Sequence, residues 1–408
     1  MPSSESRPTD QELERLFDEA CLAQSAGHLG EAEEKYFLLL GYFPHAAVLH
    51  YNLGLVYYRV KNFSAARDEF ASALHDRPED SDTLFNLALC QKKCGDCDAA
   101  IATYLELIHL APESTDCYYN LAGCYRDTFD DERAISWYRQ ALTLDAGYLP
   151  ALGNLAYMHH RLGDLPQAEG CYRRLLALRP DDASAQYMLD SLLGSPRSES
   201  PDAYVENFFD DYAEGFEKSL VDGLGYDSPR QLLACFASCC QARHITGQYA
   251  QGLDLGCGTG LGGVAFKESV GILHGVDLSA NMLLQAAGKS CYTALHQDSI
   301  AHYLLTTEET YDLFLATDVF IYVGALETIF SALRGIARPQ ALFCFSTEAL
   351  ATPGYQLQST GRFAYSREYI DHTAAATGWN VLATEATRVR KENDRWLAGD
   401  LWILQLTD

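Results

Sequence analysis

Two hydrophobic patterns divide this chain of 408 residues near residue 200. In the first half, apolar residues recur at helical spacing in units of 34 residues, and Pro44, Pro78, Pro112 and Pro180 follow one another at intervals of 34, 34 and 68. In the second half, short apolar runs alternate with amphipathic stretches. The first pattern predicts a repeat of paired helices, and the second predicts an α/β domain.

Four units of the repeat carry a short motif in which Asn and Leu precede Gly or Ala. The motif occurs at Tyr51–Gly54, Phe85–Ala88, Tyr119–Ala122 and Gly153–Ala156, and a small residue follows at Ala66, Ala100, Ala134 and Ala168. Small residues let paired helices approach closely, and larger side chains fill the spaces between units. The pattern resembles the tetratricopeptide repeat over residues 11–182. It predicts five repeats, a degenerate first one at 13–46, and a closing helix at 182–193.

The asparagine of the motif recurs at the same place in four repeats. These residues are Asn52, Asn86, Asn120 and Asn154. Because the first helix of each repeat lines the inner wall of such a superhelix, their amides predict a groove for an extended peptide. Basic residues about two turns further along favour an acidic partner. These are Arg59, Lys92, Lys93, Arg126 and Arg161. Alternatively, the asparagines only tie neighbouring repeats together.

A polar segment rich in Gly, Ser and Pro, residues 194–203, predicts a linker between a repeat domain at 11–193 and a second domain at 204–408. Strands are predicted at 250–255, 271–277, 292–296, 311–317 and 340–346, and helices at 261–268, 280–288, 299–305, 324–337 and 366–376. Two long strands, 379–390 and 396–406, end the chain as an antiparallel hairpin. The fold class is therefore an all-α superhelix followed by a Rossmann-like, doubly wound α/β sheet.

The segment GLDLGCGTGLGG, residues 252–263, joins the first predicted strand to a helix. Gly256, Gly258 and Gly260 permit a tight turn and a close approach of a ligand to the backbone. The stretch from Gly258 also fits the G-x-G-x-x-G pattern of a dinucleotide site. Asp254, however, would repel a pyrophosphate and attract an ammonium group. The loop therefore favours a positively charged cofactor.

Acidic residues also end the next two predicted strands. Asp277 can accept hydrogen bonds from both hydroxyls of a ribose, and Asp298 follows at the third strand. With the glycine loop and the closing hairpin, they make residues 204–408 resemble the class I S-adenosylmethionine-dependent methyltransferases. The resemblance implies S-adenosylmethionine as the cofactor, with Asp298 near its adenine amine. The implied cofactor residues are Asp254, Gly256, Cys257, Gly258, Gly260, Asp277, Leu278, Asp298 and Ser299. As an alternative, an acidic residue after a strand caps the next helix.

Two segments are candidate walls of the methyl-acceptor site. The fourth predicted strand and its exit loop, 311–324, contain Asp318 and Tyr322, which alternatively cap and support the next helix. The insertion at 354–366 contains one cation, Arg362, which can form a forked contact with a carboxylate, helped by Tyr355 or Tyr365. Alternatively, Arg362 is a surface arginine.

The whole set of motifs resembles a family of predicted methyltransferases that carry an N-terminal repeat array. In that family a histidine often stands where this chain has Tyr365, so the resemblance supplies no general base here. Some relatives methylate small carboxylic acids. Aromatic residues recur at helical spacing over 204–222, and we expect Tyr212 and Phe216 to lie on a lid helix over cofactor and acceptor.

The nature of the acceptor follows from the lack of an evident base. A carboxylate is already a nucleophile at neutral pH, whereas an alcohol or amine needs a base, for which only Asp318 and His296 are candidates. The sequence therefore predicts carboxylate O-methylation, with the repeats recruiting a protein or peptide. The alternatives are a methyltransferase for a small (di)carboxylic acid whose repeats serve dimerisation or scaffolding, and a non-catalytic cofactor-binding adaptor. Intact Asp254 and Asp277 disfavour the adaptor.

Composition excludes several other classes of protein and of partner. Hydrophobic residues make up 48% of the chain, yet no apolar run approaches the roughly 20 residues of a membrane span. A formal charge of −26 disfavours nucleic acid as a partner. The first residues lack a secretion signal, so the thirteen cysteines are expected to be free thiols in a reducing cytoplasm. Cys94 and Cys97 have a metal-like spacing without a second pair, and no metal site is predicted.

Overall fold

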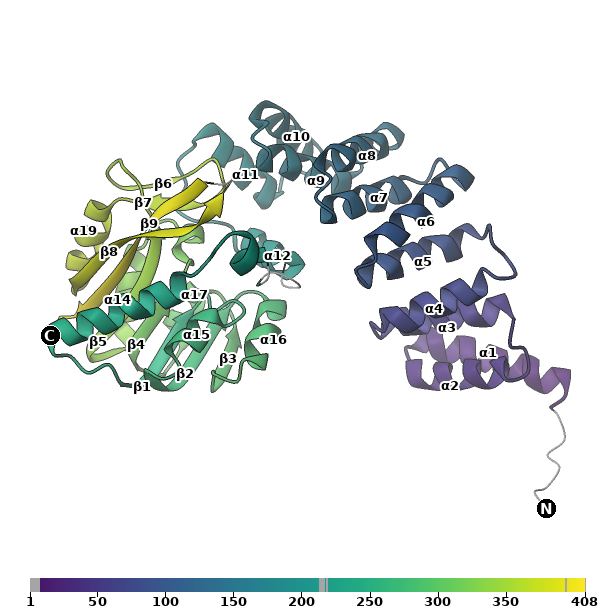
Figure 1. Ribbon diagram of the computed structural model, residues 1–408, viewed down its shortest axis with the longest axis horizontal. Helices are drawn as coiled ribbons and strands as arrows, with labels where there is room; N and C mark the ends of the chain where they lie inside the picture. The colour runs from purple at the N-terminus through teal and green to yellow at the C-terminus, as the bar shows by residue number, and fades with distance from the viewer. Residues whose placement is uncertain (1–7, 213–216, 218, 393–394, 408) are drawn as a thin grey trace, which may run out of the picture. The chain divides into compact units, whose positions relative to one another are not determined.

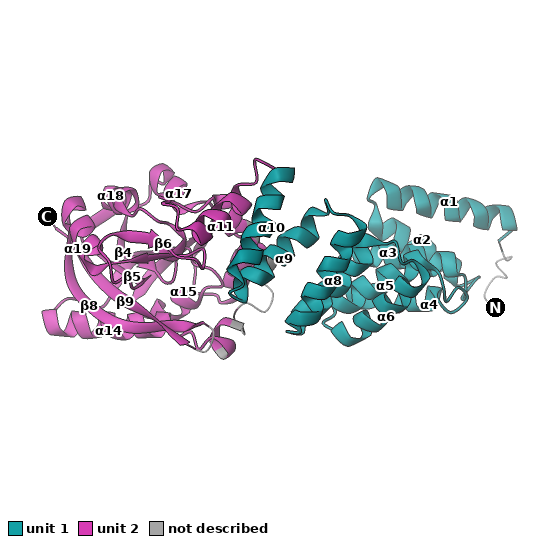
Figure 2. Cartoon of the chain, turned by 90° about the horizontal axis from the view of Figure 1, so that it is seen from above, with its two compact units in different colours: residues 1–178 teal, residues 179–408 magenta. Residues whose placement is uncertain are grey.

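Two compact units, residues 1–178 and 179–408, make up the chain and are coloured separately in Figure 2. The computed structural model describes residues 8–212, 217, 219–392 and 395–407. No helix in this described part of the chain has the length and apolar character needed to cross a membrane. Each unit has its own architecture and is described in turn.

The first unit consists of helices alone within residues 8–178, arranged as the five predicted pairs (Figure 1). The helices are α1 (Asp10–Ala26), α2 (Leu29–Leu40), α3 (Ala47–Arg59), α4 (Phe63–Ala73), α5 (Ser81–Lys93), α6 (Cys97–Leu110), α7 (Thr115–Asp127), α8 (Asp131–Leu144), α9 (Leu149–Arg161) and α10 (Leu165–Leu178). Several begin at an acidic N-cap: the side chains of Asp80, Asp96 and Asp130 each accept a hydrogen bond from the backbone three residues on. Such caps stabilise the helix start.

Small and aromatic residues at the period of the repeat build the core of this unit. The alanines Ala66, Ala100, Ala134 and Ala168 are all fully buried. A methyl group added at Gly54 would lie 2.8 Å from the ring of Phe70, so the two helices approach too closely for any side chain there. The aromatic positions of the second helices are buried as well: Tyr36, Phe70, Tyr104, Tyr138 and Tyr172. Close helix pairing and filling between units thus follow the predicted pattern.

The second unit is built around a seven-stranded sheet in the order β3-β2-β1-β4-β5-β9-β8. Its strands are β1 (Tyr249–Leu255), β2 (Val270–Asp277), β3 (Ala294–Gln297), β4 (Tyr311–Ala316), β5 (Ala337–Glu348), β8 (Trp379–Glu392) and β9 (Arg395–Leu406). The first five run parallel, and β9 is antiparallel to both of its neighbours. The predicted parallel sheet with a closing hairpin is therefore confirmed.

Helices cover both faces of this sheet (Figure 1). The helices described in this unit are α11 (Ala183–Leu193), α12 (Asp202–Tyr212), α14 (Ser228–Arg243), α15 (Leu261–Phe266), α16 (Ala280–Gly288), α17 (Ile300–Thr306), α18 (Glu327–Ile336) and α19 (Arg367–Thr377), with a π-helical turn at Ser219–Gly223 and a 3₁₀ turn at Phe320–Tyr322. Residues such as Phe236 of α14 pack on leucines of β4 and β5. On the other face, Phe330 of α18 packs on Phe343, whose ring centroid is 5.3 Å away.

Three features of the second unit differ from the prediction or were missed by it. Helix α14 was not predicted, nor were the two short paired strands of the insertion, β6 (Tyr355–Leu357) and β7 (Phe363–Tyr365). The units divide between residues 178 and 179, before α11, whereas the sequence placed α11 with the repeats and a linker at 194–203. Helix α11 therefore packs with the sheet-containing unit.

Candidate functional site

The glycine loop links β1 to α15 in a strand–turn–helix arrangement. Gly256, Gly258 and Gly260 all have positive φ angles, of 58°, 52° and 91°. A methyl group at Gly256 would lie 2.8 Å from Val319, whereas one at Gly258 would meet no atom within 4 Å. The first glycine is thus required by packing and the second leaves bare backbone beside open space. The side chain of Cys257 is buried, and its backbone amide donates to the carbonyl oxygen of Val276 at 3.0 Å.

Asp254, the residue predicted to contact a cationic group, is fully buried at the end of β1. Its Oδ2 accepts a hydrogen bond of 2.7 Å from the hydroxyl of Tyr292, while its Oδ1 is buried and has no hydrogen-bond partner. Burial raises the pKa of Asp254 from its ordinary value of 3.8 to about 7, and the nearby Asp277 acts in the same direction. A buried carboxylate oxygen without a partner favours a positively charged or hydrogen-donating ligand.

Asp277 and Asp298 lie at the ends of the next two strands, as predicted. Asp277 accepts hydrogen bonds from the backbone of Gly258 at 2.8 Å and of Ser279 at 2.9 Å, which fixes its carboxylate against the glycine loop. Leu278 follows it on the way to α16. Burial raises the pKa of Asp277.

The carboxylate of Asp298 contacts its own helix α17. It accepts from the backbone of Ser299 at 2.8 Å and from the Nδ1 atom of His302 at 2.7 Å. The hydroxyl of Ser299 caps α17 by accepting from the backbone of His302. The backbone amide of Asp298 donates to the carbonyl oxygen of Asp277 at 3.1 Å, so the two acidic residues keep a fixed spacing along this edge of the sheet.

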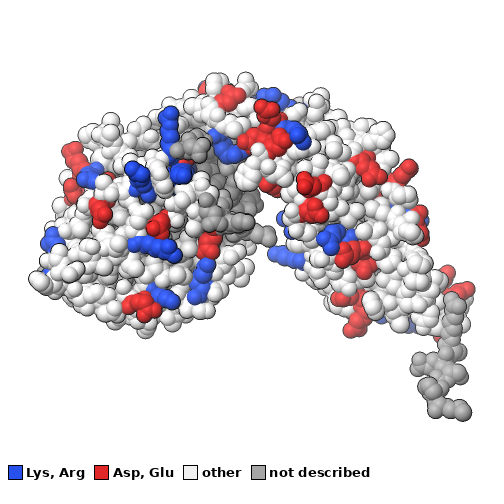
Figure 3. Space-filling model, in the orientation of Figure 1, with Lys and Arg blue, Asp and Glu red and all other residues white. Residues whose placement is uncertain are grey.

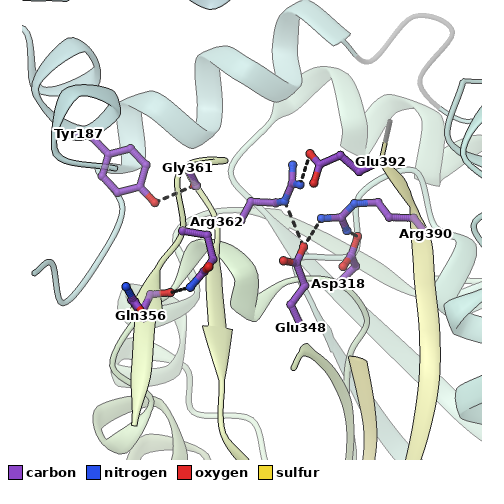
Figure 4. A network of polar contacts seen from close by, with 9 residues as sticks. Tyr187, Asp318, Glu348, Gln356, Gly361, Arg362, Arg390 and Glu392 are labelled. Atoms are coloured by element: carbon purple, nitrogen blue, oxygen red, sulfur yellow. Dashed lines mark hydrogen bonds and ion pairs between the residues drawn. The ribbon is translucent and has the colours of Figure 1, made fainter. Parts of the chain in front are cut away.

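The exit loop of β4 contains a network of buried charges, shown in Figure 4. Asp318 has a positive φ of 58°, a conformation that Asp tolerates better than most residues. Its Oδ2 lies 2.5 Å from the guanidinium of Arg390, which is 5% exposed and also pairs with Glu348 at the end of β5. Because β4, β5 and β8 end at the same edge, side chains far apart in sequence meet there.

Arg362 belongs to the same network and is not a surface arginine. Its Nε donates to Glu348 at 3.1 Å and its Nη2 donates to Glu392 at 2.6 Å (Figure 4). The fork predicted to bind a substrate carboxylate is therefore occupied by two carboxylates of the protein itself. Glu392, with its side chain 32% exposed, is the outermost carboxylate of the network. The five side chains carry two positive and three negative formal charges, a formal net charge of −1.

The tyrosines of the two predicted acceptor walls differ in their contacts. The hydroxyl of Tyr365 shares its one proton between the carbonyl oxygens of Phe320, at 2.7 Å, and Gly324, at 2.8 Å, and accepts from the amide of Gly324. Tyr365 therefore holds the exit loop in shape. The ring of Tyr355 stacks on that of Tyr365 with centroids 6.2 Å apart. Tyr322 lies in the exit loop itself, and burial raises its pKa.

The predicted lid is described in part. The side chain of Tyr212 and the whole of Phe216 lie outside the described residues. Within α12, the ring of Phe209 packs edge-on against Tyr322, with centroids 5.4 Å apart. One carboxylate oxygen of Asp210 accepts from the hydroxyl of Ser279 at 2.5 Å. Helix α12 thus contacts both the start of α16, next to the predicted cofactor residue Asp277, and the exit loop.

Sequence reasoning missed three residues of this edge: Glu348, Arg390 and Tyr226. Tyr226 is 6% exposed, and burial raises its pKa well above the ordinary value, with Asp318 and Asp254 acting in the same direction. It therefore lies close to both the predicted cofactor residue and the exit loop. The sequence does place two arginines, Arg388 and Arg390, at alternate positions of β8. Charged residues in this pattern ordinarily indicate the solvent-exposed face of a strand, so Arg390 was not recognised as part of a buried site.

Two of the four repeat asparagines, Asn86 and Asn154, contact a neighbouring repeat. The amide nitrogen of Asn154 donates to the hydroxyl of Tyr119 at 3.1 Å, and that of Asn86 lies 3.4 Å from the hydroxyl of Tyr51, each in the preceding repeat. Asn120 donates to the carbonyl oxygen of Asp116 in its own helix. These bonds support the alternative in which the asparagines stabilise the array.

Two aspartates pair with three of the five residues of the predicted basic strip. Lys92 and Arg126 both pair with Asp127, and Arg161 pairs with Asp131. On the face shown in Figure 3, acidic and basic side chains of the repeats lie beside one another. Among the residues that the structure describes, no three of His, Cys, Asp and Glu come together in a way that could hold a metal ion.

Comparisons with known protein families give matches in both parts of the chain. Residues 253–340 match the methyltransferase domain family. Residues 17–81, 51–91, 93–148 and 151–186 match tetratricopeptide repeat families. A search of curated proteins gives no match.

Solved structures of both kinds resemble parts of this chain. The tetratricopeptide protein YrrB, described as having an unusual peptide-binding site, has 21% identity and a TM-score of 0.39, covering 42% of this chain and 89% of its own. MamA from Desulfovibrio magneticus RS-1 has 18% identity and a TM-score of 0.41, covering 43% and 98%. Magnesium protoporphyrin IX methyltransferase from Synechocystis PCC 6803, with bound SAH, has 15% identity and a TM-score of 0.39, covering 51% and 100%.

Proposed function

We propose that this chain, an S-adenosylmethionine-dependent methyltransferase with an N-terminal array of tetratricopeptide repeats, methylates a carboxylate oxygen of its acceptor. The methyltransferase match spans the glycine loop, Asp277 and Asp298 in one continuous segment. The proposal concerns the acceptor, which that match does not specify. One observation supports it above all: the ionisable groups described beside the exit loop are either committed to a partner or held protonated.

The residues at the glycine loop fit the cofactor. Asp254 offers a buried carboxylate oxygen without a hydrogen-bond partner, and Gly258 leaves its backbone beside open space. When bound, S-adenosylmethionine supplies a methyl group on a positively charged sulfur, which a carboxylate-lined edge favours. Asp254 and Asp277 would hold its charged and ribose parts. The protein aligns the acceptor and excludes water.

The ionisable groups described beside the exit loop are ion-paired or held protonated before an acceptor binds. Asp318 shares its Oδ2 with the guanidinium of Arg390. Burial raises the pKa values of Tyr226 and Tyr322, so both hydroxyls stay protonated at neutral pH. His296 is on β3 at the far edge of the sheet, and its ring packs on Tyr303 with centroids 4.9 Å apart. An acceptor that needs no base, such as a carboxylate, suits this site.

The formal charge of the network around Arg362 favours one way for a carboxylate acceptor to bind. Because the network already has a formal net charge of −1, an additional carboxylate would be repelled. A carboxylate that takes the place of Glu392 on Arg362 leaves the balance unchanged. Arg362 then binds the acceptor while Glu348 continues to orient its guanidinium, and the half-exposed Glu392 turns outward.

The repeats are proposed to bind a protein or peptide, either the substrate itself or a partner. Lys92 and Arg126 share one aspartate and Arg161 pairs with another, so these three cations keep a formal charge of +1, which is compatible with an acidic partner. A small (di)carboxylic acid as the acceptor, with the repeats serving assembly, is the competing proposal. Both share the carboxylate chemistry, and one experiment separates them.

The test incubates the full-length protein with methyl-labelled S-adenosylmethionine and a cell lysate. Carboxylate methylation predicts label that mild base releases as methanol, since methyl esters hydrolyse and N- or S-methyl groups do not. Label in precipitated protein supports a protein acceptor, and label in the soluble small-molecule fraction supports a small acid. Arg362→Leu should abolish labelling, whereas the exposed Arg388→Leu in β8 serves as the matched control. Base-stable label would refute the carboxylate proposal.

A further inference from the structure

Helix α11 and the segment that follows it contact one wall of the proposed acceptor site. Tyr187 of α11 is fully buried. Its hydroxyl donates to the carbonyl oxygen of Gly361 at 2.9 Å, as Figure 4 shows, and accepts from the hydroxyl of Ser200 at 2.9 Å. Gly361 immediately precedes Arg362. The hydrogen-bonded chain from Ser200 through Tyr187 therefore fixes the backbone that carries this arginine.

The same segment contacts the other wall, the exit loop of β4. The carbonyl oxygen of Ser198 accepts a hydrogen bond of 2.7 Å from the amide of Ala325. Gly324, with a φ of 80°, lies so close that an added methyl group would be 2.1 Å from that same carbonyl oxygen. A segment with the composition of a linker is thus packed against the loop that contains Asp318 and Tyr322.

Further contacts give this segment a defined conformation. Arg197 pairs with Asp190, closing the turn after α11 with an Nε–Oδ2 distance of 2.7 Å. Gly194 ends α11 in the left-handed conformation that favours glycine. The ring of Tyr187 packs against Tyr204 of α12 with centroids 4.9 Å apart. The ends of α11 and α12 are therefore held together beside the two walls.

We propose that α11 and residues 194–201 form a structural part of the acceptor site, and that Tyr187 is a positioning residue that sets the spacing between its two walls. The inference rests on the proposed methyltransferase function. Tyr187 acts through Gly361 on one side, and through Ser200 and the neighbouring Ser198 on the other. The cofactor residues at β1, β2 and β3 are outside this set of contacts, so the effect falls on the acceptor and spares the cofactor.

The test compares full-length Tyr187→Phe and Ser200→Ala with the wild type. Tyr187→Phe removes one hydroxyl and keeps the ring, while Ser200→Ala removes the donor to that hydroxyl. The matched control is Tyr249→Phe, because the Tyr249 hydroxyl is buried in the same unit and has no hydrogen-bond partner. Three quantities are measured: the affinity for S-adenosylhomocysteine, hydrogen exchange at the Ala325 amide, and the label transfer rate over a dilution series of the lysate fraction that accepts label.

The expected result is a separation of acceptor from cofactor effects. Tyr187→Phe should raise the apparent KM for the acceptor fraction about tenfold and accelerate exchange at Ala325, while the affinity for S-adenosylhomocysteine changes less than about twofold. Ser200→Ala should act in the same direction and Tyr249→Phe should match the wild type.

Two outcomes would overturn the inference. The first is wild-type exchange at Ala325 with unchanged transfer, and the second is a parallel loss of S-adenosylhomocysteine affinity. Failure of the wild type to bind S-adenosylhomocysteine would instead contradict the proposed function. Hydrogen exchange at Ala325 and binding of S-adenosylhomocysteine can both be measured without an acceptor. The inference about Tyr187 can therefore fail while the proposed function stands, and the reverse is also true.

Discussion

Cofactor binding is predicted to be coupled to ionisation of Asp254. In the chain without a ligand, burial raises the pKa of this residue to about 7, whereas the hydrogen bond from Tyr292 acts to lower it. A cationic cofactor favours the ionised form, so a proton leaves when it binds below this pH. If only the ionised form binds, affinity rises about tenfold from about pH 6 to about pH 8 and then levels off. The groups facing Asp254 are Tyr292, Asp277, Tyr226 and Cys257.

Calorimetry with S-adenosylhomocysteine, which keeps the ammonium group, measures this coupling. Titrations at about pH 6 in two buffers of different ionisation enthalpy should report release of about 0.9 protons per site, falling to about 0.1 at about pH 8. Tyr292→Phe removes a hydrogen bond that lowers the pKa of Asp254, so its midpoint should move to higher pH. Asp254→Asn should bind weakly at every pH. A flat affinity across this range, or tight binding by Asp254→Asn, would refute the reasoning.

The same raised pKa has a consequence for stability. Because the folded chain retains the proton of Asp254 between its ordinary pKa of 3.8 and about 7, the stabilisation is present at low pH and is lost as pH rises through this window. A pKa about three pH units higher than normal corresponds to a loss on the order of 4 kcal/mol. Asp254→Asn should therefore melt at a higher temperature than the wild type at about pH 8 without ligand, and a lower melting temperature would contradict this account.

Three further predictions follow from packing and charge. Arg390→Met leaves Asp318 without its partner in a buried site, so chemical denaturation should show a loss of about 3–5 kcal/mol, while the exposed Arg388→Met should cost under about 0.5 kcal/mol. Gly263→Ala places a methyl group 2.5 Å from the Tyr292 ring, so its melting temperature and cofactor affinity should both fall. Asn154→Ala removes a bond between repeats and should lower stability by about 1 kcal/mol, measured by denaturation of the full chain.

The sequence predicted the fold well because the signals for helices and strands, such as apolar spacing and capping residues, lie within short segments of the chain. The bounds predicted for one helix, 280–288, are those of α16, where the hydroxyl of Ser279 accepts from the backbone of Met282 and so marks the first turn. Asp254 was placed correctly at the end of β1 by the same kind of reasoning. Its complete burial was not predicted, because burial depends on how residues from other elements pack around it, such as Tyr292 between α16 and β3.

The charge network could not be predicted from the sequence. Asp318 and Arg390 are separated by 72 residues, and Glu348 and Arg390 by 42. Alternation in a strand indicates which side chains share a face, but it does not indicate which residues of other elements meet them. Likewise, the Gly, Ser and Pro of residues 194–203 indicate irregular backbone. They do not distinguish a free connection from one whose carbonyl groups bind a neighbouring loop, as Ser198 does with Ala325.

The position of α11 has a practical consequence for protein engineering. A chimera that exchanges the repeat array for another domain should be joined after Leu178, the last residue of α10, so that α11 and the residues that follow stay with the sheet. A junction placed by composition at about residue 200 would sever Tyr187 from Gly361 and leave a buried carbonyl group without its donor. The best junction for such a chimera therefore lies between residues 178 and 179, before the polar segment 194–203 that composition suggests as the linker.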